Sequence, residues 1–456
     1  MIKILQVRNI DSFVESRRQK TSEKDRKTVQ AILNDVRKTG DSAVKKYERK
    51  FNGKSTSQLR VSAKEIKEAT DYEGVRDPIH LYVNRARCNA ILRAKDRLNQ
   101  QESYWFDEMK EAAKKYNKYN DMVAQRRGTE ISKLFVPIPS VGCYIPGGQA
   151  RYPSSVVMSV STAKLAGVKR IVVVSPPSSD GKIDPLTIWV AKKLGATEIY
   201  KVGGAQAIGA LAYGTKSIPK VDKIVGPGGK FVSIAKSLVS DQTAIDMIAG
   251  PTELGIIADT SSDPELVALD LISQAEHSKD TMCFVITRSK IMAKKIQKSI
   301  EKLIPGTERS SIIKESISKN GFIAVCKNQN EMIELANKIA PEHMELMVKN
   351  ARTLSKKITG AGLLLIGKNT PSSASDYLLG TNHILPTNGF GRTRGGLSVL
   401  DFLKTQTVIE SNKSALREIE ERLDLLTSAE DLPNHYKAVK RRLDDEGEEY
   451  YSPDGD

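Results

Sequence analysis

Cysteine is scarce in this chain, which has four in 456 residues: Cys88, Cys143, Cys283 and Cys326. No two of them form a CxxC pair, and all four lie in mixed or apolar sequence. A disulfide framework or a thiolate zinc site is therefore not expected, and a reducing compartment is the natural setting.

Long apolar runs are also missing. No window approaches the roughly 18 apolar residues that a membrane span needs. The first residues, Met1 to Arg8, lack the apolar core of a signal peptide. We therefore expect a cytoplasmic protein with no membrane partner.

Positive charge is in excess, with 71 Lys and Arg against 55 Asp and Glu, or a formal net charge of +16. These residues are spread along the chain among acidic ones, and aromatic residues make up only 5%. No recognition motif or aromatic platform for nucleic acid is present, so we expect no nucleic-acid partner. The length predicts at least two domains.

The apolar pattern changes along the chain. Residues 1–129 are predicted to be mainly helical, for example at 25–39 and 77–99, with no strand. Beyond about residue 131, short β-branched runs ending in Gly or Pro turns alternate with helix-like segments, which is typical of parallel α/β sheets. The predicted strands are 170–175, 198–202, 222–225, 253–258, 283–286, 322–325 and 363–366.

This pattern predicts two consecutive α/β domains, at 130–250 and 251–395. We expect the N-terminal region 1–129 to pack on the second of them, and 396–456 to be a helical C-terminal segment. No turn matches the G-x-G-x-x-G fingerprint between a strand and a helix, so a standard Rossmann nucleotide site is not predicted. Glycines at strand ends, as in Gly226-Pro-Gly-Gly229, still allow a ligand to approach the backbone.

Histidine is rare, and four of the five histidines have neighbours suited to ligation or proton transfer. The helix opened by Asp263-Pro264 should carry Gln274 and His277 on one face, three residues apart. The adjacent Glu342 and His343 follow a helix over 330–339 and could act together as a base.

The other two histidines lie in polar segments. After the last predicted strand, Asp376 could bind a cation and His383 an anion, while Glu430 and His435 lie in the C-terminal segment. Taken singly, each of these groups is typical of an ordinary helix end, turn or surface, and that interpretation is the better one for each alone.

Several segments occur together in an order and spacing similar to those of the histidinol dehydrogenase family, over about residues 25–445. They are VGCYIPGG at 141–148, YPSS at 152–155, VGGAQAI at 202–208, IDMIAGP at 245–251, SQAEH at 273–277, PEH at 341–343 and DYLLGTNHILPT at 376–387. Each match is modest, but the set is specific. His80 falls on no family site position, so a packing or surface role is retained for it.

The resemblance implies two linked, incomplete Rossmann-like α/β domains with helical pieces at both ends, in an intertwined homodimer whose C-terminal segment contributes to dimerisation. The implied reaction is the oxidation of L-histidinol to L-histidine through the aldehyde with two NAD, the last steps of histidine biosynthesis. It also implies one zinc ion per subunit, bound by Gln274, His277, Asp376 and by His435 of the partner subunit.

The remaining implied roles concern catalysis and binding. His343 would be the general base, and Glu342 would activate the water that hydrates the aldehyde. Besides the zinc ligands and His343, the substrate would contact Thr252, His383 and Glu430. The implied cofactor contacts are Tyr144 and Gln206, on the first α/β domain.

The helix over 158–164 differs from the usual family sequence, and two single positions also depart from the family pattern. The family usually has Asn, a cofactor contact, where this chain has Gly229, and Ser where it has Thr252. A relative that oxidises another small alcohol, such as a sulfonated diol, is the alternative function. Glu430 and His383 argue instead for an amino, imidazole-bearing substrate, because a sulfonate would favour cationic partners at the position of Glu430.

Overall fold

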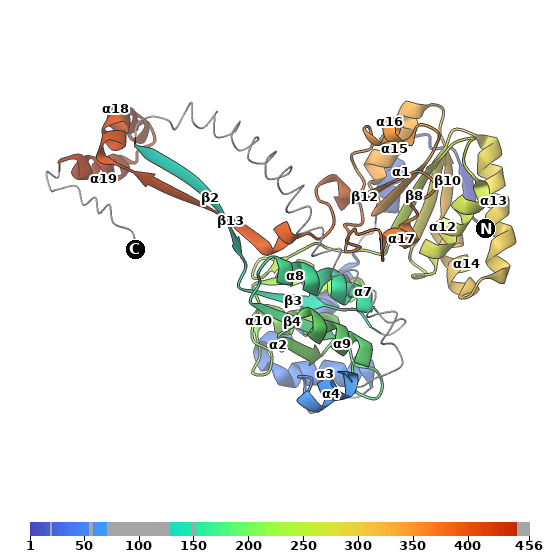
Figure 1. The fold of residues 1–456 in the computed structure, drawn as a ribbon, viewed down its shortest axis with the longest axis horizontal. Coiled ribbons are helices and arrows are strands. Elements are labelled where there is room, and N and C mark those ends of the chain that lie inside the picture. The colour runs from blue at the N-terminus through green and yellow to red at the C-terminus, as the bar shows by residue number, and fades with distance from the viewer. Residues whose placement is uncertain (19–20, 54–57, 71–127, 148–151, 445–456) are drawn as a thin grey trace. The chain divides into compact units, whose positions relative to one another are not determined.

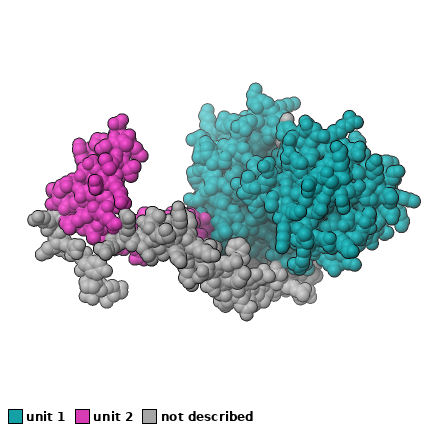
Figure 2. Space-filling model, turned by 90° about the horizontal axis from the view of Figure 1, so that it is seen from above, with its two compact units in different colours: residues 1–90, 137–402 teal, residues 91–136, 403–456 magenta. Residues whose placement is uncertain are grey.

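The computed structural model describes residues 1–18, 21–53, 58–70, 128–147 and 152–444. The helix predicted at 77–99, and with it His80 and Cys88, lies outside these residues. The chain divides into two compact units (Figure 2): residues 1–90 and 137–402 form the first, and residues 91–136 and 403–456 form the second.

The first unit contains a parallel six-stranded sheet in the order β1-β10-β9-β8-β11-β12. Its strands are β1 (Lys3–Leu5), β8 (Glu253–Ala258), β9 (Met282–Thr287), β10 (Phe322–Val325), β11 (His343–Met347) and β12 (Leu363–Ile366). Nearly all of β8 to β11 is buried, which is why β8, β9 and β10 carry mostly apolar runs and not an alternating pattern.

A second parallel sheet, also in the first unit, has five strands in the order β5-β4-β3-β6-β7. They are β3 (Ser140–Tyr144), β4 (Arg170–Ser175), β5 (Glu198–Lys201), β6 (Lys223–Val225) and β7 (Ala244–Ile245). The strand order reverses between β3 and β6, so the loops after these two strands diverge and leave a crevice at their carboxyl ends. The α/β fold class predicted from the sequence is confirmed.

Helices cover both faces of the six-stranded sheet (Figure 1). Residues of α12, α13 and α14 share a core with one face, and residues of α1, α15 and α16 share a core with the other. These helices are α1 (Ile10–Arg17), α12 (Pro264–Ala275), α13 (Lys290–Leu303), α14 (Ser310–Lys319), α15 (Gln329–Ile339) and α16 (Ala351–Ser355); the short α17 (Ser372–Ser375) follows β12.

The remaining helices of the first unit are associated with the five-stranded sheet. They are α2 (Glu23–Thr39), α3 (Asp41–Asn52), α4 (Ala63–Thr70), α7 (Pro153–Val156), α8 (Thr162–Leu165), α9 (Pro185–Leu194), α10 (Gly204–Tyr213) and α11 (Lys230–Val239). A π-helical turn, Val157–Ser161, links α7 to α8.

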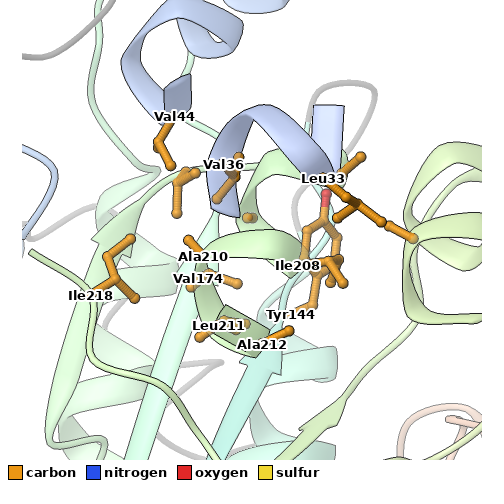
Figure 3. Close-up of a cluster of buried hydrophobic side chains, with 14 of the residues drawn as sticks. Leu33, Val36, Val44, Tyr144, Val174, Ile208, Ala210, Leu211, Ala212 and Ile218 are labelled. Carbon is orange, nitrogen blue, oxygen red and sulfur yellow. The ribbon is translucent and has the colours of Figure 1, made fainter. Parts of the chain in front are cut away.

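The N-terminal helices pack differently from our expectation. Leu33 and Val36 of α2 and Val44 of α3 lie in one core with Ile208 and Leu211 of α10, on the five-stranded sheet (Figure 3). The expected packing of residues 1–129 on the second α/β domain is therefore wrong for α2 and α3. It holds for α1, whose Phe13 ring lies edge-on to Phe322 of β10 at 5.1 Å. An amphipathic face fits any apolar surface, so its sequence does not specify which sheet it covers.

Among the residues that the structure describes, two strands and two helices belong to the second unit. Strands β2 (Thr129–Pro137) and β13 (Leu403–Ser411) pair in a two-stranded sheet, and α18 (Lys413–Ala429) contacts α19 (Pro433–Asp444). Neither β13 in the C-terminal segment nor β1 near the N-terminus was expected. Across the described residues, no helix combines the length and apolar character required to cross a membrane.

Candidate active site

A cavity of about 590 Å³ in the first unit is lined by strand ends from both parallel sheets. Gly226, Pro227 and Gly228 follow the carboxyl end of β6, and they line it together with Thr252, which precedes β8. The catalytic candidates Glu342 and His343 are at the amino end of β11. The cavity therefore uses the carboxyl edge of the five-stranded sheet and the amino edge of the six-stranded sheet.

Strand pairing brings Thr252 and Glu342 together, although they are 90 residues apart. In the register of β8 and β11, His343 lies opposite Leu254, so the residues just before each strand are neighbours. The Thr252 hydroxyl donates to Glu342 Oε2, which also accepts the N–H of Glu253 at 3.0 Å. Gln274 Nε2 donates to the Thr252 hydroxyl at 2.7 Å. A continuous hydrogen-bonded series, Gln274–Thr252–Glu342, results.

His343 lies between two carboxylates in a nearly closed setting, with 1% of its surface exposed. Its Nε2 is 3.2 Å from Asp376 Oδ1, and its Nδ1 is 3.8 Å from Glu342 Oε2 and has no hydrogen-bond partner. Burial alone would lower the pKa of His343, but Glu342 and Asp376 outweigh it and raise that pKa to about 9. The neutral ring is therefore a strong base, and the protonated ring gives up its proton only at alkaline pH.

The two carboxylates respond to their surroundings in opposite directions. Burial raises the pKa of Glu342, which makes this carboxylate a better base than an exposed glutamate. Burial also opposes ionisation of Asp376, but the hydrogen bond and charge of His343 outweigh it and leave the pKa of Asp376 lowered. Asp376 thus remains an anion beside His343.

The other two histidines of the site line the same cavity. His277 lies just beyond the end of α12, whose Asp263 cap and Pro264 start agree with the sequence prediction. The helix ends at Ala275, so the prediction that both Gln274 and His277 lie on it is wrong for His277. His383 Nδ1 is 2.9 Å from the carbonyl oxygen of Asp376, and its Nε2 is 3.3 Å from the Ser155 hydroxyl. Burial lowers the pKa of both histidines, which favours neutral rings.

Gln274 is buried behind Thr252 and does not line the cavity. Within the part of the chain that the structure describes, no group of three or more His, Cys, Asp or Glu side chains has the spacing of a metal site. His435, in α19, and Glu430, at the end of α18, are exposed residues of the second unit.

The two expected cofactor residues are enclosed. Tyr144 is 4% exposed and its hydroxyl accepts the N–H of Gly204 at 3.1 Å. Gln206 is 1% exposed, and its Nε2 donates to Glu48 Oε1 at 2.7 Å while its Oε1 has no hydrogen-bond partner. Neither residue lines the cavity described above.

Sequence reasoning missed three residues of the site. Ser155 contacts His383 and lies in the YPSS segment, so a serine after a helix-starting proline was an available signal. Glu253, next to Thr252, accepts the N–H of Glu342 at 3.3 Å. Arg309 lines the cavity from the turn before α14, and no pattern in the sequence marks it.

Comparison with known proteins shows the family to which the chain belongs. The family model for histidinol dehydrogenase matches residues 15–443. The histidinol dehydrogenase of Methanocaldococcus jannaschii is 41% identical over 419 residues, covering 91% of this chain and 92% of the relative. That of Bacillus cereus is 40% identical over 420 residues, covering 92% and 93%.

A solved structure gives the same result at the level of the fold. The crystal structure of histidinol dehydrogenase from Elizabethkingia anophelis superposes with a TM-score of 0.84 at 32% identity, covering 97% of this chain and 98% of that one. The chain therefore belongs to the histidinol dehydrogenase family and is an NAD-dependent oxidoreductase.

Proposed function

We propose that this chain oxidises L-histidinol to L-histidine through histidinal, reducing two NAD, as the last steps of histidine biosynthesis. The observation that carries the proposal is the position of His343 and Glu342, two buried bases in contact with one cavity. The family membership of the chain supports the choice of substrate.

In the first oxidation, His343 takes the hydroxyl proton of histidinol while the hydrogen on the same carbon leaves with its electron pair for NAD. Asp376 holds the ring at Nε2 and stabilises the protonated form. The product is the aldehyde, which stays bound in a cavity that limits its contact with water.

In the second oxidation, Glu342 takes a proton from a water molecule whose oxygen adds to the aldehyde carbon. The electrons of the C=O π bond move to the carbonyl oxygen, which takes the proton that His343 gained in the first oxidation. The hydrated aldehyde then loses its remaining carbon-bound hydrogen as hydride to a second NAD and a hydroxyl proton to His343, and the resulting acid ionises to the carboxylate. Thr252 and the N–H of Glu253 hold Glu342 Oε2 in place for this step. Thr252 is also proposed to contact the substrate, as are His383 and Glu430.

We propose one zinc ion per subunit, with Gln274, His277, Asp376 and His435 of the partner subunit as ligands. Two imidazoles, a carboxylate and an amide oxygen suit zinc without a thiolate. The lowered pKa of His277 supports a neutral nitrogen donor, and Asp376 lines the same cavity. When bound, zinc would supply orientation of the substrate's imidazole and amine.

The same proposal includes a homodimer with shared sites. Glu430 and His435 belong to the second unit, which exposes many large apolar side chains. The exposed apolar side chains of the second unit are Ile131, Leu134, Phe135, Val408, Ile409, Ile419, Leu425, Leu426 and Leu432. A surface of this kind is typical of a protein-protein contact.

We assign the cofactor to residues 130–250 and the catalytic and zinc residues to residues 251–395. The strand-order reversal beside β3 supports this division, because parallel sheets bind nucleotides at such points. Tyr144 at the carboxyl end of β3 and Gln206 in α10 are the proposed cofactor contacts; the buried, unpartnered Oε1 of Gln206 supports the second of these.

The direct test follows NADH formation and histidine production by the zinc-loaded protein. We expect two NADH for each histidinol consumed, and no comparable rate with a sulfonated diol. Absence of turnover with histidinol would overturn the proposed substrate. Removal of zinc with a chelator should abolish activity and zinc should restore it; full activity in metal-free protein would contradict the ligand assignment.

A further inference from the structure

A buried ion pair lies behind one wall of the cavity. Lys236 of α11 and Asp246, just after β7, are 0% and 3% exposed, and their side chains form an ion pair. Neither residue lines the cavity, and neither has a place in the proposed chemistry.

Both members of the pair bind the same backbone unit. Lys236 Nζ donates to the carbonyl oxygen of Gly226 at 3.0 Å, and Asp246 Oδ2 accepts the N–H of Gly226 at 2.7 Å. Asp246 Oδ1 also accepts the N–H of Met247 at 2.5 Å. Gly226 and Met247 both line the cavity, so the pair holds two segments of its wall.

The backbone conformation at Gly226 is also restricted by steric contacts. Its φ of +111° favours glycine, and a Cβ at this position would lie 2.2 Å from the carbonyl oxygen of Tyr144. One turn of α11 before Lys236, Ser233 donates to the carbonyl oxygen of Ala249, which also lines the cavity. Helix α11 thus anchors the wall through two residues on one face.

The charges themselves need an explanation, because an enclosed ion pair stabilises a fold no better than apolar side chains of similar volume. Two apolar side chains would leave the N–H and the carbonyl of Gly226 without these partners. The arrangement is therefore explained by what the pair does for the turn and not by packing alone.

We propose that Lys236 and Asp246 are positioning residues for NAD: they hold the Gly226–Gly228 turn in the shape against which the cofactor binds. This inference rests on the proposed function only in placing NAD at the carboxyl edge of the five-stranded sheet. It names two residues that act through the backbone and do not touch the substrate.

The test compares two double variants of the full-length protein. Lys236→Met/Asp246→Leu removes the pair, and Lys201→Met/Glu65→Leu removes a matched pair on the same sheet, at 2.8 Å, with no cavity-lining partner. NADH binding is measured by fluorescence titration without histidinol, together with KM for each substrate, kcat and the melting temperature.

We expect the first double variant to bind NADH about tenfold or more weakly, as the loss of two backbone anchors suggests. Its KM for histidinol should stay near that of the parent, and the control should bind NADH normally even if it melts earlier. Parental NADH affinity in a folded Lys236→Met/Asp246→Leu protein would overturn the inference.

If that double variant does not fold, Lys236→Met/Asp246→Asn decides. It leaves no unpaired buried charge and keeps one acceptor for the N–H of Gly226, so it should fold. It should bind NADH more weakly because the carbonyl oxygen of Gly226 loses its Lys236 donor; parental affinity would overturn the inference. Because NADH binding needs no histidinol, failure of the proposed substrate is distinguished from failure of the positioning role.

Discussion

The imidazole of His343 has a carboxylate near each nitrogen and almost no contact with solvent. An Asn there keeps polarity but cannot accept the substrate's proton. We expect His343→Asn to lower kcat by ~10²–10⁴-fold, with KM for histidinol changed little. The control is His80→Asn, for which no site role is proposed and which should keep the parental kcat. More than a tenth of parental kcat in the His343 variant would exclude a general base there.

Gly229 stands where the family usually has an asparagine that contacts the cofactor. Its φ of −64° suits any residue, and a Cβ there would meet nothing within 4 Å. We expect Gly229→Asn to tighten NADH binding by about two- to tenfold, the effect of one added hydrogen bond. Calorimetric titration measures this, and unchanged or weaker binding would show that this turn has adapted to glycine.

Glu253 is a buried acid whose pKa burial raises to about 8. A folded-state pKa above the unfolded value means that the group's contribution to stability is complete at low pH and is lost as pH rises toward 8. The free energy of unfolding of the parent should therefore fall, relative to Glu253→Gln, between about pH 5 and pH 8. Urea unfolding across this range checks it. The control is Glu198→Gln, which removes a carboxyl whose pKa is lowered. The difference in unfolding free energy between the parent and this control should not fall over the same pH range.

At the scale of elements, strands with uninterrupted apolar sequence were predicted well. The predicted bounds of β4, β8, β10 and β12 agree with the structure. Strand β11 was missed because His-Met-Glu-Leu-Met has no β-branched residue, so Glu342 and His343 were placed at a helix end. Here a polar pair begins a buried strand, and tertiary contacts override local propensity.

The candidate site depended on pairings that spacing does not reveal. Local patterns alone favoured ordinary surface roles for Gln274, His277 and Asp376, and the family resemblance was what singled them out. The contact between Thr252 and Glu342 exists only because β8 and β11 are neighbours, although two strands and four α-helices separate them along the chain. Strand order is a property of the whole core, and no single segment encodes it.

Close packing across the six-stranded sheet gives a prediction for β8. A Cβ added at Gly255 would lie 2.4 Å from the ring of Phe284 on β9 and 3.0 Å from Met344 on β11. We expect Gly255→Ala to lower the free energy of unfolding by about 1–3 kcal/mol, the usual cost of overpacking. Gly306→Ala, where a Cβ meets nothing within 4 Å, is the control. Denaturant unfolding would contradict the prediction if the two variants were equally stable.

At the scale of the whole molecule, the proposed sharing of His435 between subunits can be tested by mixing two inactive variants. In a mixed dimer of His343→Asn and His435→Asn chains, one site receives both changes and the other receives neither. Refolding equal amounts together should restore about a quarter of parental activity if chains assort randomly. Each variant alone should remain inactive. A mixture with no recovery would show that each chain uses its own His435.

The two parallel sheets meet the cavity with opposite strand ends, so the carboxyl ends of β8, β9 and β11 lie away from the proposed catalytic residues. The connections at 259–263, 288–289 and 348–350 follow the carboxyl ends of β8, β9 and β11. At the ~3.3 Å rise of each strand residue, the first begins roughly 23 Å from Thr252 and the last roughly 17 Å from His343. We therefore expect that a fluorophore or a surface linker attached at exposed Asn350 leaves the proposed catalytic residues in place.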